Sequence, residues 1–167
     1  MVVGKRIATL NFRELVVLCG VFLRHPLYLL PTYKATREAV AISDRLYGDL
    51  HHKDNRTNAF RHALWNYLIC RSCLPAAGSP GNAMSWSKRI TDLHERLSPN
   101  EGLAKEMDLH NNRIGRELFI DSLDKEKEEV VFILQQKTGE AIKIESVEEI
   151  EKENNKLVFL EKLKTPK

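Results

Sequence analysis

The segment from Thr57 to Arg71 constrains the fold more than any other part of this chain. Apolar side chains occur around its whole circumference rather than in one stripe, which predicts a helix that is buried on every side. Three polar residues inside it, Asn58, His62 and Asn66, are spaced four apart and therefore share one face of a helix. Burying polar groups without partners costs about 1–3 kcal/mol each. This strip must therefore pair with other polar groups or line a cavity.

A second apolar helix, expected at residues 101–123, also carries polar residues in its middle. Residues 108–113 read Asp-Leu-His-Asn-Asn-Arg, and Asp and Asn are mediocre helix formers. Such departures from local preference inside a strong helix are expected at functional sites. On an ideal helix His110 points roughly 200° away from Asp108, so these two residues should not share a ligand. We expect the two helices to pack with His62 facing Asp108.

This pairing predicts a site with two alternative chemistries. A carboxylate bonded to one imidazole nitrogen fixes the tautomer, and the other nitrogen is then free to accept a proton from water. The same groups, joined by His94 or Glu95, could instead hold a divalent metal ion with one position left open. The candidate catalytic residues, and equally the candidate metal ligands, are His62, His94, Glu95 and Asp108. The residues expected to bind substrate are Asn58, Arg61, Asn66, His110, Asn111, Asn112 and Arg113.

A structural explanation competes with the functional one. A buried network of His, Asp and Asn side chains can fix helix register without any chemistry. In that alternative the protein is a non-catalytic binding or interaction domain. His51 and His52, by contrast, are expected to be solvated in a polar loop at residues 49–56.

The distribution of charge bears on partners more than the net charge of +3 does. Residues 1–100 carry 14 Lys and Arg against 7 Asp and Glu. A basic first part suits an anionic small molecule or an anionic membrane surface. Residues 15–30 are rich in leucine and are the expected place of peripheral membrane contact. No recognised nucleic-acid motif is present, so nucleic acid is not the expected partner.

The sequence predicts a cytoplasmic protein. Its cysteine number, three, argues against a disulfide framework. The apolar run at residues 15–23 is shorter than the roughly 20 residues that span a bilayer, and no small-x-small cleavage site follows it.

The spacing of apolar residues predicts a mainly α fold, a single-domain bundle of about five helices. Residues 1–124 form the helical domain that carries the site, and residues 125–167 form a small α/β appendage of the same domain, with a short β-hairpin. The segment 125–137 fits a helix or a strand. The five expected helices are residues 11–23, 31–47, 57–71, 82–97 and 101–123.

Two segments of the sequence resemble an uncharacterised bacterial domain family. They are Asn58-Ala59-Phe60-Arg61-His62-Ala63-Leu64-Trp65-Asn66 and Asp108-Leu109-His110-Asn111-Asn112-Arg113-Ile114-Gly115-Arg116. That family also occurs at the ends of larger secreted or toxin-like proteins, and the resemblance implies a shared site but no particular reaction.

A looser likeness is to the prokaryotic phospholipases A2. In that family one helix carries an Arg-His pair, and an Asp on a second helix contacts the His. Arg61-His62 with Asp108 is similar, but Ala63 stands where that family has its calcium-binding Asp, which puts calcium dependence in doubt. Taken together, these features favour a small hydrolase acting on an ester or phosphoester, with a lipid-like substrate as one option.

Overall fold

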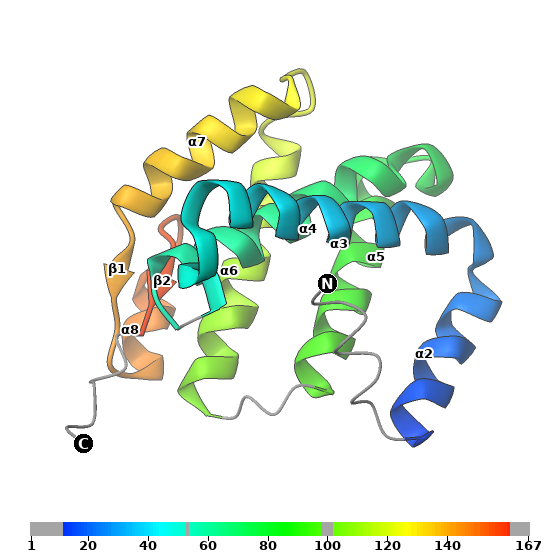
Figure 1. Ribbon diagram of the computed structural model, residues 1–167, viewed down its shortest axis with the longest axis horizontal. Coiled ribbons are helices and arrows are strands. Elements are labelled where there is room, and N and C mark those ends of the chain that lie inside the picture. The colour runs from blue at the N-terminus through cyan, green and yellow to red at the C-terminus, as the bar shows by residue number, and fades with distance from the viewer. Residues whose placement is uncertain (1–11, 53, 98–101, 161–167) are drawn as a thin grey trace.

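The computed structural model describes residues 12–52, 54–97 and 102–160, with the backbone alone for residues 12–16 and 18 (Figure 1). The predicted mainly α fold is confirmed. The helices are α2 (Phe12–Arg24), α3 (Pro26–Tyr47), the 3₁₀ helix η1 (Gly48–His52), α4 (Arg56–Ala77), α5 (Pro80–Arg96), α6 (Leu103–Ile120), α7 (Lys127–Gly139) and α8 (Val147–Lys152). The strands are β1 (Ile142–Lys143) and β2 (Val158–Phe159).

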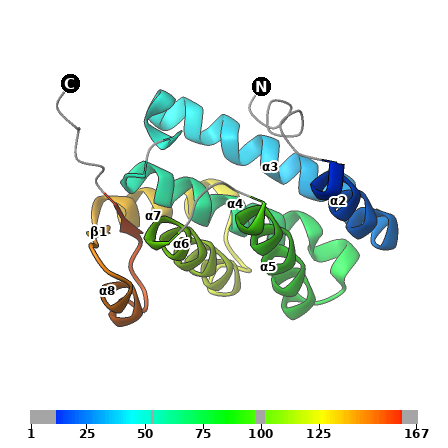
Figure 2. The ribbon, with the colours of Figure 1, turned by 90° about the horizontal axis from the view of Figure 1, so that it is seen from below.

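Helix α4 is the centre of the molecule. It contacts α3, α5, α6 and α7, and Figure 2 shows α3 on one side of α4, with α5 and α6 on the other. Neighbours on all sides explain why apolar side chains occur around the whole circumference of α4. Fully buried side chains such as Phe60, Leu64 and Tyr67 fill the space around it.

The ends of α4 lie beyond the predicted limits. The side chain of Asn55 caps the helix by accepting hydrogen bonds from the backbone N–H groups of Thr57 and Asn58. At the other end the helix continues past Arg71 through Pro75 to Gly78, whose φ of 71° provides the left-handed C-cap. Apolar contacts of the last turn, where Cys73 and Ala77 are buried, outweigh the local cost of the proline.

Helix α3 begins one turn earlier than the sequence suggested. Pro26 occupies its first turn, where a missing N–H costs nothing, and Pro31, expected to open the helix, lies inside it. Pro31 removes one hydrogen bond to the carbonyl of Leu27, a residue that is exposed.

Helices α4 and α6 cross at Gly115, where the two backbones nearly touch. A Cβ built on Gly115 would lie 2.0 Å from the carbonyl oxygen of Ala63. Gly115, a poor helix former, therefore permits the close crossing that brings His62 and Asp108 together.

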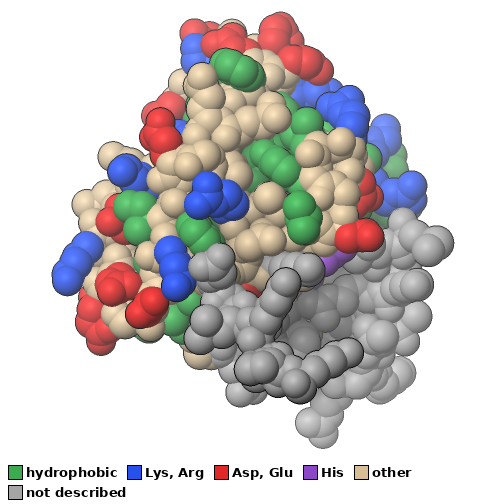
Figure 3. Space-filling model, turned by 60° about the vertical axis from the view of Figure 1, so that its left-hand side comes forward, with side chains coloured by type: hydrophobic (Ala, Val, Ile, Leu, Met, Phe, Trp, Pro, Cys, Tyr) green, Lys and Arg blue, Asp and Glu red, His purple; other side chains and the backbone are tan. Residues whose placement is uncertain are grey.

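The segment at residues 125–137, left open between helix and strand, is helical as α7. Acidic side chains gather at the top of the face in Figure 3, where α7 begins.

The predicted β-hairpin is wrong, because β1 and β2 pair in parallel, with Ile142 opposite Val158. The intervening α8 turns the chain so that both strands run in the same direction, which a tight turn cannot do.

Two further observations complete the fold. The first part of the polar loop expected at residues 49–56 belongs instead to the 3₁₀ helix η1. His51, expected to be solvated, is fully buried there, and its Nε2 donates to Oδ1 of Asp44 at the end of α3. None of the helices that the structure describes combines the length and the apolar composition needed to span a bilayer.

Candidate functional site

Three polar strips meet where α4, α5 and α6 pack together. Each strip consists of three residues spaced four apart, so each lies on one face of its helix. Every one of the nine side chains is buried, with no more than 7% of its surface exposed. The strips are Asn58, His62 and Asn66 on α4; Ser87, Thr91 and Glu95 on α5; and Asp108, Asn112 and Arg116 on α6.

His62 occupies the middle of this polar core, and the predicted contact with Asp108 is present. Its Nε2 lies 3.3 Å from Oδ1 of Asp108. Its Nδ1 lies 3.2 Å from Oδ1 of Asn112 and 3.7 Å from Oε1 of Glu95. One imidazole thus touches both of the other helices.

The surrounding amides determine which nitrogen of His62 carries the proton. The Oδ1 of Asn66 accepts hydrogen bonds from Ser87, Thr91 and Arg116, so its amino group must be the one that donates to Oδ1 of Asn112, at 2.6 Å. Oδ1 of Asn112 is therefore an acceptor, and Nδ1 of His62 donates to it. The lone pair of His62 is left on Nε2, which faces Asp108 and accepts a hydrogen bond from the guanidinium of Arg61 at 3.0 Å.

Burial keeps the His62 ring neutral. Loss of solvent, and after it the nearby charge of Arg61, lowers the pKa of His62 to about 3. A neutral imidazole with an oriented lone pair is the form that binds metal ions, whereas a base of such low pKa takes protons poorly near pH 7.

His62, Glu95 and Asp108 together form a cluster with the composition of a metal site. Each contributes one nitrogen or oxygen atom, and these three atoms lie within 4.8 Å of one another. Asn112 holds two of the three residues in place, because it accepts from His62 and donates to Oε1 of Glu95 at 3.3 Å. Asn58 holds the third by donating to Oδ1 of Asp108 at 3.3 Å.

A pocket of about 520 Å³ between α5 and α6 reaches this polar core. Glu95 and Arg116 belong to both the core and the pocket wall. The wall is predominantly basic, since five of its eight residues are Lys or Arg; it consists of Lys88, Asp92, Glu95, Arg96, Lys105, Leu109, Arg113 and Arg116. Such a wall attracts anionic groups.

Several residues predicted for the site lie elsewhere. His94 is not part of the polar core, because neighbouring residues on a helix diverge by about 100°. Its ring makes a T-shaped contact with the ring of Trp65. His110 bonds to the carbonyl of Lys156, and Asn111 bonds to the backbone of Val158. Arg113 lines the pocket but pairs with Glu117.

The polar core is completed by Ser87 and Thr91, which were not among the predicted site residues, and by Arg116. They bind Oδ1 of Asn66 at 2.9, 3.2 and 2.8 Å. The signal that identifies them is the repeated spacing of four: Ser87 and Thr91 lead to Glu95, and Arg116 continues the series from Asp108 and Asn112.

Comparison with known proteins identifies the family of this chain but no individual relative. A search of curated proteins found no match. A family model described as a domain of unknown function matches residues 19–142, which include α3 to α7 and all nine residues of the polar core. The chain therefore belongs to this family, the domain of unknown function DUF6973.

Proposed function

We propose that this protein is a metal-dependent hydrolase of a phosphoester, with its centre at His62, Glu95 and Asp108. The convergence of one imidazole and two carboxylates from three different helices supports this proposal most directly. Catalytic metal sites commonly use three protein ligands and leave a position for water or substrate. The imidazole and the hard carboxylate oxygens together suit zinc or manganese.

The basic pocket supports a phosphoester rather than a neutral ester as substrate. Arg116 and Lys105 in its wall would bind the anionic group of a substrate, while Glu95 stands where the pocket meets the polar core. A divalent ion held at the centre would supply a water of lowered pKa and would stabilise the charge that develops on the phosphoryl group. Asn112 would keep His62 and Glu95 oriented towards it.

Lipid-like phosphoesters belong to the proposed substrate range because leucines are exposed on α2 and α3. Leu23, Leu27 and Leu30 have 80%, 73% and 58% of their surface exposed, and such side chains favour contact with a membrane surface. The substrates to compare are therefore a soluble phosphodiester, such as bis(p-nitrophenyl) phosphate, and vesicles of an anionic phospholipid.

The decisive experiment changes one carboxylate while keeping its shape. Asp108→Asn should lower phosphodiester hydrolysis in the presence of zinc or manganese by about 100-fold or more, because it removes a charged ligand from the metal. The unfolding midpoint in urea should move little, since the amide oxygen of asparagine can still accept from Asn58. Glu106→Gln, a change of an exposed carboxylate on the same helix, serves as the matched control and should retain full activity.

Two results would refute the proposal. One is a wild-type protein that neither binds zinc or manganese nor hydrolyses the phosphodiester or the phospholipid. The other is an Asp108→Asn protein with a large loss of stability and wild-type activity, which is what a structural network and a non-catalytic interaction domain predict.

A further inference from the structure

We propose a second metal site, formed by Asp44, His51 and His52 where α3 meets η1. One ligand atom from each of these residues lies within 4.8 Å of the other two. The site uses none of the residues proposed for hydrolysis and is independent of that function.

His51 and Asp44 supply two adjacent ligand atoms. Nε2 of His51 lies 2.7 Å from Oδ1 of Asp44, and the side chain of His51 is fully buried. Nε2 is therefore the nitrogen of His51 that faces the cluster. Because a metal ligand must be deprotonated, a divalent cation bound to these two atoms and to a nitrogen of His52 would replace the proton that Nε2 donates to Asp44.

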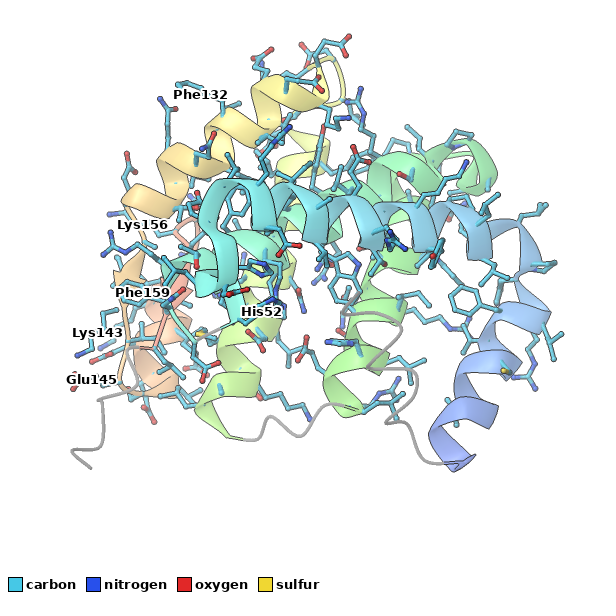
Figure 4. All side chains as sticks on the ribbon, in the orientation of Figure 1. His52, Phe132, Lys143, Glu145, Lys156 and Phe159 are labelled. Atoms are coloured by element: carbon cyan, nitrogen blue, oxygen red, sulfur yellow. The ribbon has the colours of Figure 1, made fainter. Side chains whose placement is uncertain are left out.

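His52 gives the cluster a route to solvent. Its ring lies with its centroid 4.0 Å from that of His51, and the residue is exposed. Figure 4 shows His52 projecting from the turn that follows α3. A metal ion can therefore reach the cluster without any unfolding of the helices around the polar core.

The donor set indicates which ion would bind. Two imidazoles and one carboxylate suit zinc, nickel or copper better than magnesium or calcium, which prefer oxygen ligands only. Tetrahedral zinc with ligands at about 2.0–2.2 Å separates its ligand atoms by about 3.4 Å. Small adjustments of the exposed side chains of Asp44 and His52 are enough to reach that spacing from the present one.

Isothermal titration calorimetry of zinc into the 167-residue protein at pH 7.5 tests this site. His52→Ala and Asp44→Asn should each weaken one zinc-binding event by about 10-fold or more. Both changes are at exposed positions, so the proteins should remain folded. Asp49→Asn changes an exposed carboxylate of the same 3₁₀ helix that is not in the cluster, and it should bind zinc as the wild type does.

The outcome also separates this site from the hydrolytic centre. Zinc binding that is lost in Asp108→Asn but unchanged in both His52→Ala and Asp44→Asn would overturn the second site and leave the first intact. A wild-type protein that binds no zinc at all would overturn it as well. An event lost in His52→Ala and Asp44→Asn, and retained in Asp108→Asn, is the expected result.

Discussion

At the scale of single residues, Asn66 organises the polar core. Its Oδ1 accepts three hydrogen bonds, from Arg116, Ser87 and Thr91, and its amino group donates to Asn112. The amide thus connects all three helices and, through Asn112, sets the tautomer of His62. Its role is to position other groups, which separates it from the carboxylates proposed to bind metal.

We expect Asn66→Ala to destabilise the protein strongly. It leaves the buried guanidinium of Arg116 and two hydroxyl groups without their common acceptor, and the free energy of unfolding should fall by about 3 kcal/mol or more. Urea denaturation measures the change. Asn154→Ala, at an exposed position, should alter the stability by no more than about 0.5 kcal/mol. Equal stability of the two variants would show that the amide does not hold the helices together.

At the scale of elements, the site depends on how closely α4 and α6 approach. Gly115 lies against the backbone of Ala63, and this crossing is next to the pair His62 and Asn112. The helix pair can only adopt this distance because neither residue has a larger side chain. Helix propensity alone would favour alanine over glycine by about 1 kcal/mol, so packing determines the residue here.

Gly115→Ala should therefore destabilise the protein despite its better helix propensity. The added methyl group would overlap the carbonyl of Ala63 and push the helices apart, which costs about 1–3 kcal/mol or more. The same experiment on Gly81→Ala in α5, where an added Cβ meets nothing within 4 Å, should leave stability unchanged or slightly increased. The midpoint temperatures of thermal unfolding of the two variants measure the difference. A Gly115→Ala protein more stable than the wild type would contradict the close approach of α4 and α6 at this residue.

At the scale of the whole molecule, α6 joins the polar core to the C-terminal segment. One face of α6 carries Asp108 and Asn112, which belong to the polar core. Another face carries Asn111, which bonds to the backbone of β2. Asn111 accepts from the N–H of Val158 at 3.0 Å and donates to its carbonyl at 2.9 Å. β1 binds the other edge of β2. The domain boundary at residue 124 stays a prediction, and the family match extends across it.

Asn111→Ala should release β2 without opening the helical core. The amide of Val158 would lose its acceptor, and its hydrogen exchange should accelerate by about 10-fold or more, which corresponds to about 1.4 kcal/mol of local stability. Amides in the middle of α4 should exchange as before. Asn155→Ala, an exposed neighbour of the strand, provides the control. Uniform acceleration throughout the protein would mean instead that the segment and the core unfold together.

From the chain alone, the periodicity of apolar residues predicts the helical class and the buried character of α4. The cost of burying polar groups predicts that His62 meets Asp108, although the close crossing at Gly115 is what permits their contact. The sequence did not determine that Glu95 rather than His94 joins the pair, that His110 and Asn111 serve β2, or that His51 is buried. Those depend on how each helix is rotated and packed against its neighbours, which only the tertiary structure decides. The parallel pairing of β1 and β2 was decided in the same way, since a two-residue strand specifies no partner until α6 and α8 place both strands side by side.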